Sequence, residues 1–510
     1  PLAEGWSARI GGEWSRSDSE TDGVYFKRLA VFPSLAWSPD AGTRVVLRLR
    51  HVDNRTLDYA GLPVDGTLDT STFTLQRSFN LSATGLPETT QSSDGANLQW
   101  TQRLDERWSF GLTAAWNRVK MDERGVFPVP FGGGGPVQAL FGARLWNDWR
   151  TTTLSPALTG KLDWAGMRHT LSLGLDHERS TDDAYMAFSV GPGFFGDLGM
   201  VDLTHPVLPA WVEPLAPNPP DQRNRYTASV AYVQDQVDIG RWHLLGGLRY
   251  SRISVTDVNS SPMFGQNNVS KNSKATPRVG AVFDISPAVS VFAGYSEGIK
   301  VPTGSLFATP PKPETSVQKE IGLRLKDLAG VSATLAVFDL RRRNAPVTDP
   351  TTFLSVQTGE QRAKGVDLDL RWQATPALTL LAAYTAQTAR VTEHAFDPTL
   401  VDKRLFNVPE RQGRLAARYE FRQGDLAGLG LGLGVTSRGR LPIDNANSAY
   451  APAATVWDAQ LSYRHGIGRY GLSVQNLLDK AYWQPAAYFG GGQVLPALPR
   501  SVSASAQFSF

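Results

Sequence analysis

The sequence predicts an all-β protein, a transmembrane antiparallel β-barrel, from three observations. Apolar and polar residues alternate with a period of two in about twenty segments, which places successive side chains on opposite faces of a strand. The connections alternate between short turns and long loops, as they do on the two rims of an outer-membrane barrel. Tryptophans recur beside the short turns, where an aromatic girdle lies. A soluble β-sandwich has no physical reason to sort loop length or tryptophan in this way.

Residues 501–510 show the alternation most clearly. Serine and glutamine occupy one face, the other face is apolar and uncharged, and the chain ends on Phe510. This pattern is typical of the closing strand of a barrel with lipid on one side and a water-filled lumen on the other. By itself it also fits the edge strand of a soluble sandwich, so the assignment depends on repetition along the chain.

The same alternation recurs in segments whose polar face is charged. The clearest are 317–326, 366–372, 414–422, 457–464 and 470–475. In the second of these, Leu368 follows Asp367 and precedes Asp369. An Arg or Lys facing lipid at the bilayer midplane costs roughly 2–4 kcal/mol. We therefore expect the charged faces to line an aqueous lumen and the apolar faces to meet lipid.

The connections sort into two classes. Short turns are predicted at 38–42, 105–107, 285–288, 327–330 and 374–377. Long connections are predicted at 56–91, 122–148, 182–222, 258–272, 298–313, 344–357, 393–407, 441–452 and 481–495. The tryptophans beside short turns are Trp37, Trp108, Trp164, Trp242 and Trp372. In an outer-membrane barrel the long loops face the exterior and the short turns face the periplasm.

Composition excludes several classes of protein. The 510 residues contain no cysteine, which excludes a disulfide scaffold, a thiolate metal site and a cysteine nucleophile. No apolar run approaches the roughly 18 residues of a membrane-spanning helix, a test that a barrel escapes because only every second residue meets lipid. The 51 basic and 48 acidic residues nearly balance, so we expect no nucleic-acid partner.

The first six residues lack a signal sequence, and we expect the chain to start within a larger protein.

Motifs of enzymes are present only in part. Gly294-Tyr-Ser296-Glu-Gly298 matches G-x-S-x-G, but Pro302 soon follows and prevents the helix that a nucleophile elbow requires. The alternation of Leu and Gly over 428–435 fits a strand better than a dinucleotide loop. The seven histidines show no paired metal spacing, although His205 and His394 lie in long loops and could touch a ligand. We expect no catalysis, no metal site and no intrinsic cofactor.

Several ordered motifs resemble the barrel of TonB-dependent siderophore receptors. They are Tyr295-Ser-Glu-Gly298, Lys312-Pro-Glu314, Glu320-Ile-Gly322, Gln357-Thr-Gly-Glu360, Lys364-Gly-Val-Asp-Leu368, Asn407-Val-Pro409, Asn476-Leu-Leu-Asp-Lys480-Ala-Tyr482 and Pro499-Arg500-Ser-Val502. The resemblance implies a plugged barrel of the 22-stranded type, with residues 1–510 supplying about twenty strands. From the resemblance we expect the plug domain, the TonB box and the first hairpin to be missing from this chain. Because open edges in lipid are prohibitive, the intact protein is expected to supply that hairpin.

The resemblance also implies a function. It implies a multi-pass receptor of the bacterial outer membrane that takes up a ferric siderophore by TonB-dependent active transport, with iron present only in the bound ligand. The implied partners are the ferric siderophore, outer-membrane lipid and the TonB–ExbB–ExbD complex, reached through the missing amino-terminal region, and we expect a monomer. The alternatives are a receptor for haem, cobalamin or carbohydrate, or a passive pore or adhesin. Haem receptors often carry a Phe-Arg-Ala-Pro box where this chain has Gly298-Ile-Lys-Val-Pro302, which counts against haem.

Candidate contact residues follow from loop position and residue type. The aromatic candidates for ligand binding are Tyr59, Phe131, Trp146, Phe195, Trp211, Phe307, Tyr450 and Tyr488. Arg144 and Lys300 could meet an anionic chelate. Loop aromatics can also pack on one another or face lipopolysaccharide, and only a cluster pointing inward would form a pocket. The lumenal charges expected to face the plug are Glu320, Arg324, Asp367, Asp369, Arg414 and Arg418.

Overall fold

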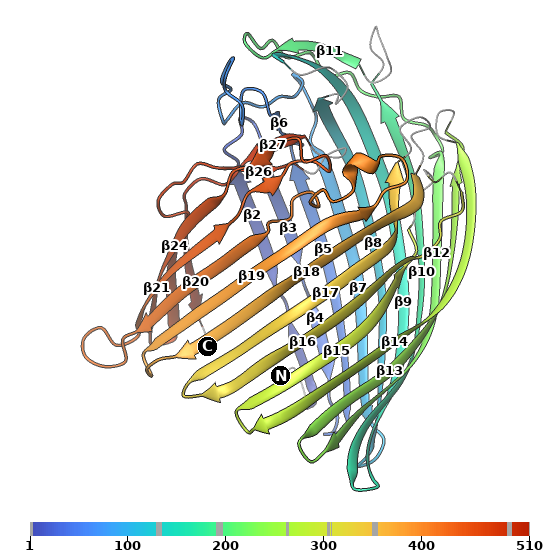
Figure 1. Cartoon of the computed structure of the whole chain (residues 1–510), viewed down its shortest axis with the longest axis vertical. Helices are drawn as coiled ribbons and strands as arrows, with labels where there is room; N and C mark the ends of the chain where they lie inside the picture. Colours follow the sequence, from blue (N-terminus) through green and yellow to red (C-terminus); the bar gives the residue numbers. More distant parts are fainter. Residues whose placement is uncertain are drawn as a thin grey trace.

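The computed structural model describes residues 4–128, 135–189, 197–261, 265–302, 307, 309–348, 355–486 and 492–508. Over these ranges one large antiparallel sheet curves into an open barrel (Figure 1). Its strands are β1 (Trp6–Arg9), β2 (Gly12–Asp18), β3 (Tyr25–Val31), β4 (Ser34–Trp37), β5 (Thr43–Thr56), β7 (Thr89–Arg103), β8 (Trp108–Pro128), β9 (Val137–Trp164), β10 (Met167–Phe188), β11 (Asp197–Asp202), β12 (Gln222–Ile239), β13 (Trp242–Asn259), β14 (Gln266–Ser286), β15 (Val289–Lys300), β16 (Glu314–Leu328), β17 (Val331–Thr348), β18 (Ser355–Gln373), β19 (Leu378–Glu393), β20 (Arg411–Glu420), β21 (Leu429–Arg438), β24 (Ala454–His465), β25 (Gly468–Gln475) and β28 (Ser501–Phe508).

The remaining elements are short and lie in the long loops. They are β6 (Leu62–Pro63), β22 (Leu441–Pro442), β23 (Tyr450–Ala451), β26 (Trp483–Pro485), β27 (Gln493–Pro496) and the 3-10 helix η1 (Pro398–Leu400). No helix in the described ranges has the length and apolar character needed to cross a membrane.

The strand count confirms the sequence prediction. β1 and β2 pair with successive parts of the next strand, β4 and β3, and β11 continues the pairing of β10 along β9. Merged in this way, the 23 strands of the main sheet correspond to about twenty barrel strands. Each strand pairs with its neighbour in sequence, so the topology is a simple up-and-down meander.

The register shows which side chains share a face. Leu368 of β18 lies opposite Leu335 and Tyr384 on the adjoining strands, whereas Asp367 lies opposite Thr385. At the end of the chain, Ala504 of β28 lies opposite an outward leucine of β25. The apolar face carries most of the exposed large hydrophobic residues, as the outer surface of a membrane barrel does. The predicted inside-outside assignment is therefore confirmed, although Phe510 lies outside the described residues.

The two rims also match the prediction in outline. The turns at 38–42, 105–107, 285–288, 327–330 and 374–377 fall between consecutive strands or overlap their ends. All five tryptophans beside short turns lie on the apolar face, and Trp164 is 70% exposed. The structure therefore places an aromatic ring at the short-turn rim.

Some predicted long loops are in part strand, and there the prediction was wrong. β8 runs to Pro128 and β9 starts at Val137, both inside the predicted loop 122–148. The same holds within 182–222, 258–272 and 344–357. Beyond the bilayer both faces of a hairpin meet water or packed loops, so the apolar alternation fades while the backbone pairing continues.

The sheet leaves a seam between its first and last strands. β28 pairs on one edge with β25, and β1 and β2 pair on one edge with β4 and β3. No pairing among the described residues joins β28 to β1 or β2. At the long-loop rim, however, β6 pairs with β27, which pairs with β26. The loops of the two ends of the sheet are thus connected above the seam (Figure 1).

Candidate functional site

The long-loop rim carries a packed layer of loops that we call the loop cover: residues 57–88, 203–221, 439–453, 476–486 and 492–500. Its core contains Leu62, Leu81 and Leu203, which are almost completely buried in one cluster with Leu140 of β9. A second apolar cluster joins Ile443 to other loops of the cover, with Trp483 touching both clusters. Burial of this extent removes apolar surface from water and fixes the loops relative to the barrel.

Arg77 connects two loops of the loop cover with the turn between β2 and β3. Its Nε and Nη2 donate to the two carboxylate oxygens of Glu20 at 3.0 and 3.1 Å, in the turn between β2 and β3. Its Nη1 donates to the carbonyl of Tyr482 at 3.1 Å, and its guanidinium lies 4.9 Å from the ring of Trp483. A planar guanidinium can make all these contacts at once, so Arg77 links the first long loop to the last.

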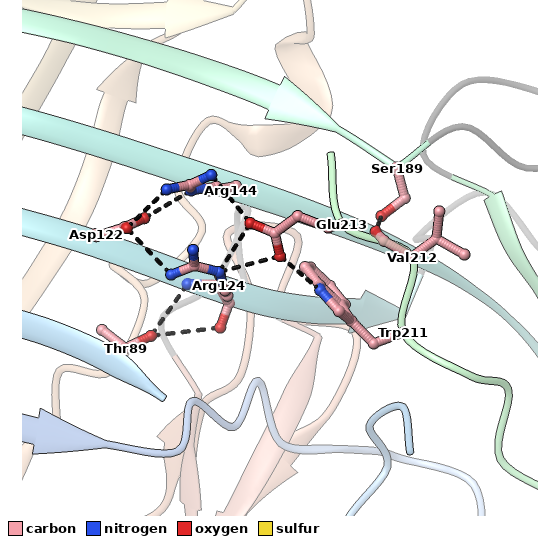
Figure 2. Close-up of polar contacts among 8 residues, drawn as sticks. All are labelled: Thr89, Asp122, Arg124, Arg144, Ser189, Trp211, Val212 and Glu213. Carbon is pink, nitrogen blue, oxygen red and sulfur yellow. Dashed lines mark hydrogen bonds and ion pairs between the residues drawn. The ribbon is translucent and has the colours of Figure 1, made fainter. Parts of the chain in front are cut away.

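A second polar cluster fixes residues 203–221 to the tall β8–β9 hairpin (Figure 2). Arg144 donates to both oxygens of Asp122 at 2.8 Å, and Arg124 lies 3.1 Å from the same carboxylate. Glu213 lies 3.0 Å from each guanidinium and accepts from Trp211 Nε1 at 2.8 Å. Two cations meet two anions, so the cluster is neutral.

Glu213 titrates below its ordinary range because of this cluster. Burial on its own raises the pKa of the Glu213 carboxyl, but the hydrogen bonds from Arg124 and Trp211 outweigh burial, and the net shift lowers the pKa. At neutral pH the carboxylate therefore remains charged and paired.

Several of the predicted ligand contacts are already paired, stacked or buried within the protein. Arg144 and Trp211 belong to the cluster around Glu213. Trp146 stacks on Tyr185 with ring centroids 5.8 Å apart. Tyr59 donates to the carbonyl of Phe79 at 3.2 Å, and burial raises the pKa of its phenol. Phe307 is only 7% exposed.

Tyr450 combines an aromatic ring with two cations. The guanidinium carbons of Arg404 and Arg440 lie 5.5 and 4.5 Å from its ring centroid. Arg404 is only 6% exposed, whereas Arg440 is exposed and forms no ion pair with any described residue. Lys300 ends β15 opposite Glu314, whose carboxylate pairs with Arg342 instead.

The remaining loop predictions have a mixed outcome. Phe131, Phe195 and Tyr488 lie outside the described residues. The prediction did not single out Arg404 or Arg440. For Arg440 the sequence signal available was the arginine pair at 438 and 440, which directly precedes a loop. His205 contacts its neighbour Thr204 at 3.0 Å, and His394 accepts from the backbone N–H of Asp397 at 3.1 Å.

The predicted lumenal charges lie on the inner face, and the structure brings three of the six together. A hollow of about 710 Å³ in the inner wall near the short-turn rim is lined by Arg324, Asp369 and Arg414, with Arg371 as a member that the prediction omitted. Arg414 also lies 3.1 Å from Asp458. The three charges outside this hollow are Glu320, Asp367 and Arg418. A wall with exposed charges of both signs suits a polar, water-accessible interior.

The enzyme-like motifs are parts of strands. Ser296 lies within β15, between Arg278 and Gln318 on the neighbouring strands, and so not at a strand-to-helix turn. The leucine and glycine run forms β21, and a Cβ at Gly430 would lie 2.5 Å from Ser462 Oγ. In the described part of the chain, no group of three or more His, Asp or Glu side chains could hold a metal ion.

Comparison with known proteins decides the family. Residues 5–477 match the family model described as TonB dependent receptor-like, beta-barrel. The chain belongs to this family. Among curated relatives, the metal-pseudopaline receptor CntO of Pseudomonas aeruginosa is 27% identical over 95% of this chain and 68% of that protein. The ferrioxamine receptor of Yersinia enterocolitica is 24% identical over 100% of this chain and 71% of its own length.

The fold agrees with solved receptors. The crystal structure of the siderophore receptor PiuA from Acinetobacter baumannii has a TM-score of 0.87 at 20% identity, and the match covers 99% of this chain and 78% of that one. TonB-dependent receptors are outer-membrane proteins, and this barrel is one of them. Its long-loop rim therefore faces the exterior. The family comprises receptors and transporters rather than enzymes.

Proposed function

We propose that this receptor takes up a ferric siderophore across the outer membrane by TonB-dependent active transport. The observation that carries the proposal is the arrangement of a charged inner wall beneath a packed loop cover that presents aromatic rings and guanidinium groups. Relatives named for ferrioxamine, ferrichrome and metal-pseudopaline support the same class of ligand. Iron then enters as part of the cargo, and the protein needs no cofactor of its own.

We propose Tyr450 and Arg440 as the first contacts for the chelate. The ring offers a flat apolar surface, and the exposed guanidinium offers charge-assisted hydrogen bonds to an anionic chelate. Lys300 is a second cation without an ion pair among the described residues. Tyr59, Arg144, Trp146, Trp211 and Phe307 would then act by shaping the loop cover, because their polar groups or rings are already engaged.

We further propose that residues 1–510 form the barrel domain of a longer, monomeric receptor. A hairpin inserted between β28 and the β1–β2 strand would pair the edges that the sheet leaves open in lipid, where unpaired backbone groups are costly. A plug domain would then face Arg324, Asp369 and Arg414, and its amino-terminal segment would reach the TonB–ExbB–ExbD complex.

The test is a growth and uptake assay with the intact gene. A receptor-deleted strain that carries this gene is grown under iron limitation on single ferric chelates, including ferrioxamine and ferrichrome, and uptake of radioactive iron is measured with and without TonB. We expect one chelate class to support uptake that disappears without TonB, and Arg440→Gln to weaken its binding. Uptake independent of TonB would indicate a passive pore and refute the proposal.

A chelate of another metal is the second candidate. The CntO relative, named for metal-pseudopaline, supports it at 27% identity. The same strain tested with nickel and zinc chelates distinguishes the two candidates. TonB-dependent uptake of these metals, without uptake of iron from any ferric chelate, would mean that the cargo is a chelate of another metal and not a ferric siderophore.

A further inference from the structure

One sector of the inner wall carries arginines without carboxylates. β5 directs every second side chain into the lumen, and three of these side chains are Arg44, Arg48 and Arg50. Arg9 of β1 faces the same way, because it lies opposite Ser34 of β4, which in turn lies opposite Arg48. We call these four arginines the cationic track. All four are exposed, and none forms an ion pair with a described residue.

Neutral groups hold the arginines of the track in place. Arg48 Nη1 donates to Gln99 Oε1 at 2.7 Å. Arg50 Nη2 donates to Ser93 Oγ at 3.0 Å and to Asn117 Oδ1 at 3.3 Å. Amide and hydroxyl oxygens accept hydrogen bonds but carry no charge. These contacts therefore orient the two guanidiniums and leave their positive charge uncompensated.

A glycine makes room for this arrangement. Gly95 of β7 lies opposite Arg50, and a Cβ at this position would be 2.9 Å from Asn117 Oδ1. Without that Cβ, the Arg50 side chain can cross β7 and reach β8. The carboxylate next to Gly95, Asp94, lies on the outer face of β7 and pairs there with His51 at 2.7 Å. It is therefore not available to the track.

The track borders a hollow of about 520 Å³ in the inner wall. The hollow is lined by Arg9, Arg48 and Arg50, and by the amide side chains of Asn97 and Asn117. Residues two apart on a strand are separated by about 7 Å, and neighbouring strands by about 4.8 Å, so successive guanidiniums lie within reach of one chelate-sized anion. Arg44, one residue from the start of β5, continues the line to the short-turn rim.

Another hollow of the inner wall, of about 490 Å³, shows the contrast. It also contains two arginines, Arg249 and Arg278, but its lining includes the carboxylates Asp176 and Glu297. Arg249 lies 3.2 Å from Asp176. Two hollows of similar size and equal depth in cations thus differ in net charge, and only the one beside β5 is uniformly positive.

The loop cover connects the track with the proposed first contacts for the chelate. Val64 and Leu68, in the loop that follows β5, pack against the buried cluster that contains Ile443 and Ala451. Ala451 directly follows Tyr450 on β23. The loop above β5 and the loop that carries Tyr450 therefore form one packed layer, and the track begins beneath it.

We infer that the cationic track is the path along which the cargo crosses the lumen, and that this cargo is a chelate with net negative charge. The inference rests on the proposed function and names its class of chelate. A cleft lined by charges of one sign raises the local concentration of the opposite ion and its rate of entry by roughly 10- to 1000-fold. Carboxylate and catecholate complexes of ferric iron are anionic and gain from such a wall, whereas neutral ferrichrome and cationic ferrioxamine B do not.

The first test is the choice of cargo. A receptor-deleted strain with the intact gene is given ferric citrate, a ferric catecholate, ferrichrome and ferrioxamine B in turn, and uptake of radioactive iron is measured with and without TonB. We expect TonB-dependent uptake from an anionic chelate and none from the other two. TonB-dependent uptake from ferrichrome or ferrioxamine B would overturn the inference and leave the proposed function in place. Uptake independent of TonB would refute the proposed function itself.

The second test compares double variants of the inner wall. Arg48→Gln with Arg50→Gln removes two cations from the track. Arg249→Gln with Arg278→Gln removes two cations from the hollow that contains carboxylates, and serves as the matched control. For each variant, the Kd of the chelate is measured on cells without TonB and the maximal uptake rate on cells with TonB. Heat-modifiable migration on a gel confirms that each variant is folded.

We expect the track variant to lower the maximal uptake rate roughly tenfold with the Kd unchanged, and the control to change the rate less than about twofold. Arg48→Lys with Arg50→Lys should restore most of the rate, because the charge is kept. An equal loss in the Gln and Lys variants, or in the track variant and the control, would overturn the inference. Unchanged uptake, accompanied by TonB-independent entry of a large antibiotic, would also overturn it, because these arginines would then hold the plug in place instead.

Discussion

Leu368→Arg should prevent the barrel from inserting into membranes, whereas Asp367→Arg should not. The two residues are adjacent in sequence but lie on opposite faces of β18. Leu368 is flanked across the sheet by Leu335 and Tyr384. It also lies within the outward apolar stretch of its strand, which runs from Trp372 at the short-turn rim to Val366.

The magnitude follows from that position. An arginine near the centre of the lipid belt costs roughly 2–4 kcal/mol in a transmembrane barrel, and the aliphatic and aromatic neighbours of Leu368 offer no carboxylate to pair with it. This cost is a large part of the stability of a typical protein, about 5–15 kcal/mol. At position 367 the same side chain enters the aqueous lumen opposite Thr385, where it keeps its hydration.

The assay is folding of purified protein into lipid vesicles, followed by the gel shift between heated and unheated samples. We expect a large loss of the folded band for Leu368→Arg and a yield within about twofold of the original for Asp367→Arg. Equal yields for both variants would contradict the assignment of the two faces, and with it the register from which the lumen is derived.

Three further outcomes are expected. Arg77→Ala should speed proteolysis of the loop cover while leaving the barrel band on gels intact; unchanged cleavage would mean that Arg77 is not a link between loops. Glu213→Gln should lower the protection of residues 203–221 against hydrogen exchange at neutral pH, measured relative to the intrinsic rate of an unstructured chain. Acidification should lower this protection in the original protein too, because a carboxylate with a lowered pKa contributes stability above its usual pKa and loses it as pH falls through the lowered value. Protection that does not change with pH would exclude the ion pairs as the cause. Gly322→Ala should reduce folding yield because its Cβ would lie 2.4 Å from the carbonyl oxygen of Leu335, and a normal yield would show that the strands can separate locally.

Sequence periodicity was sufficient for the membrane part of the fold. Leu368 and Asp367 could be assigned to opposite faces without coordinates, because lipid and water impose opposite requirements on successive side chains of every strand. The same physical contrast located the short turns and the tryptophans beside them. Beyond the bilayer, where lipid no longer meets one face, the prediction failed: β8 continues to Pro128 although a loop was predicted there.

For the candidate site, too, the sequence predicted some features and only the folded structure showed the others. Residue type and loop position singled out Tyr450, but not the two guanidiniums against its ring, which come from residues 46 and 10 positions earlier in the chain. Arg144 seemed available to a ligand from sequence, and only the fold shows that Asp122 and Glu213 already pair with it. Such partners are set by how loops cross above the barrel, and no local pattern encodes that crossing.

The sequence by itself thus determined the class of barrel, the side of each strand that meets lipid and the family resemblance. The tertiary structure decided which charges are compensated, as the contrast between Arg118 and Arg225 shows: both are outward-facing arginines, but only the first has a carboxylate partner on the adjoining strand. The physical reason is that alternation is a property of one strand, whereas neutralisation depends on the register between strands and therefore on the folded sheet.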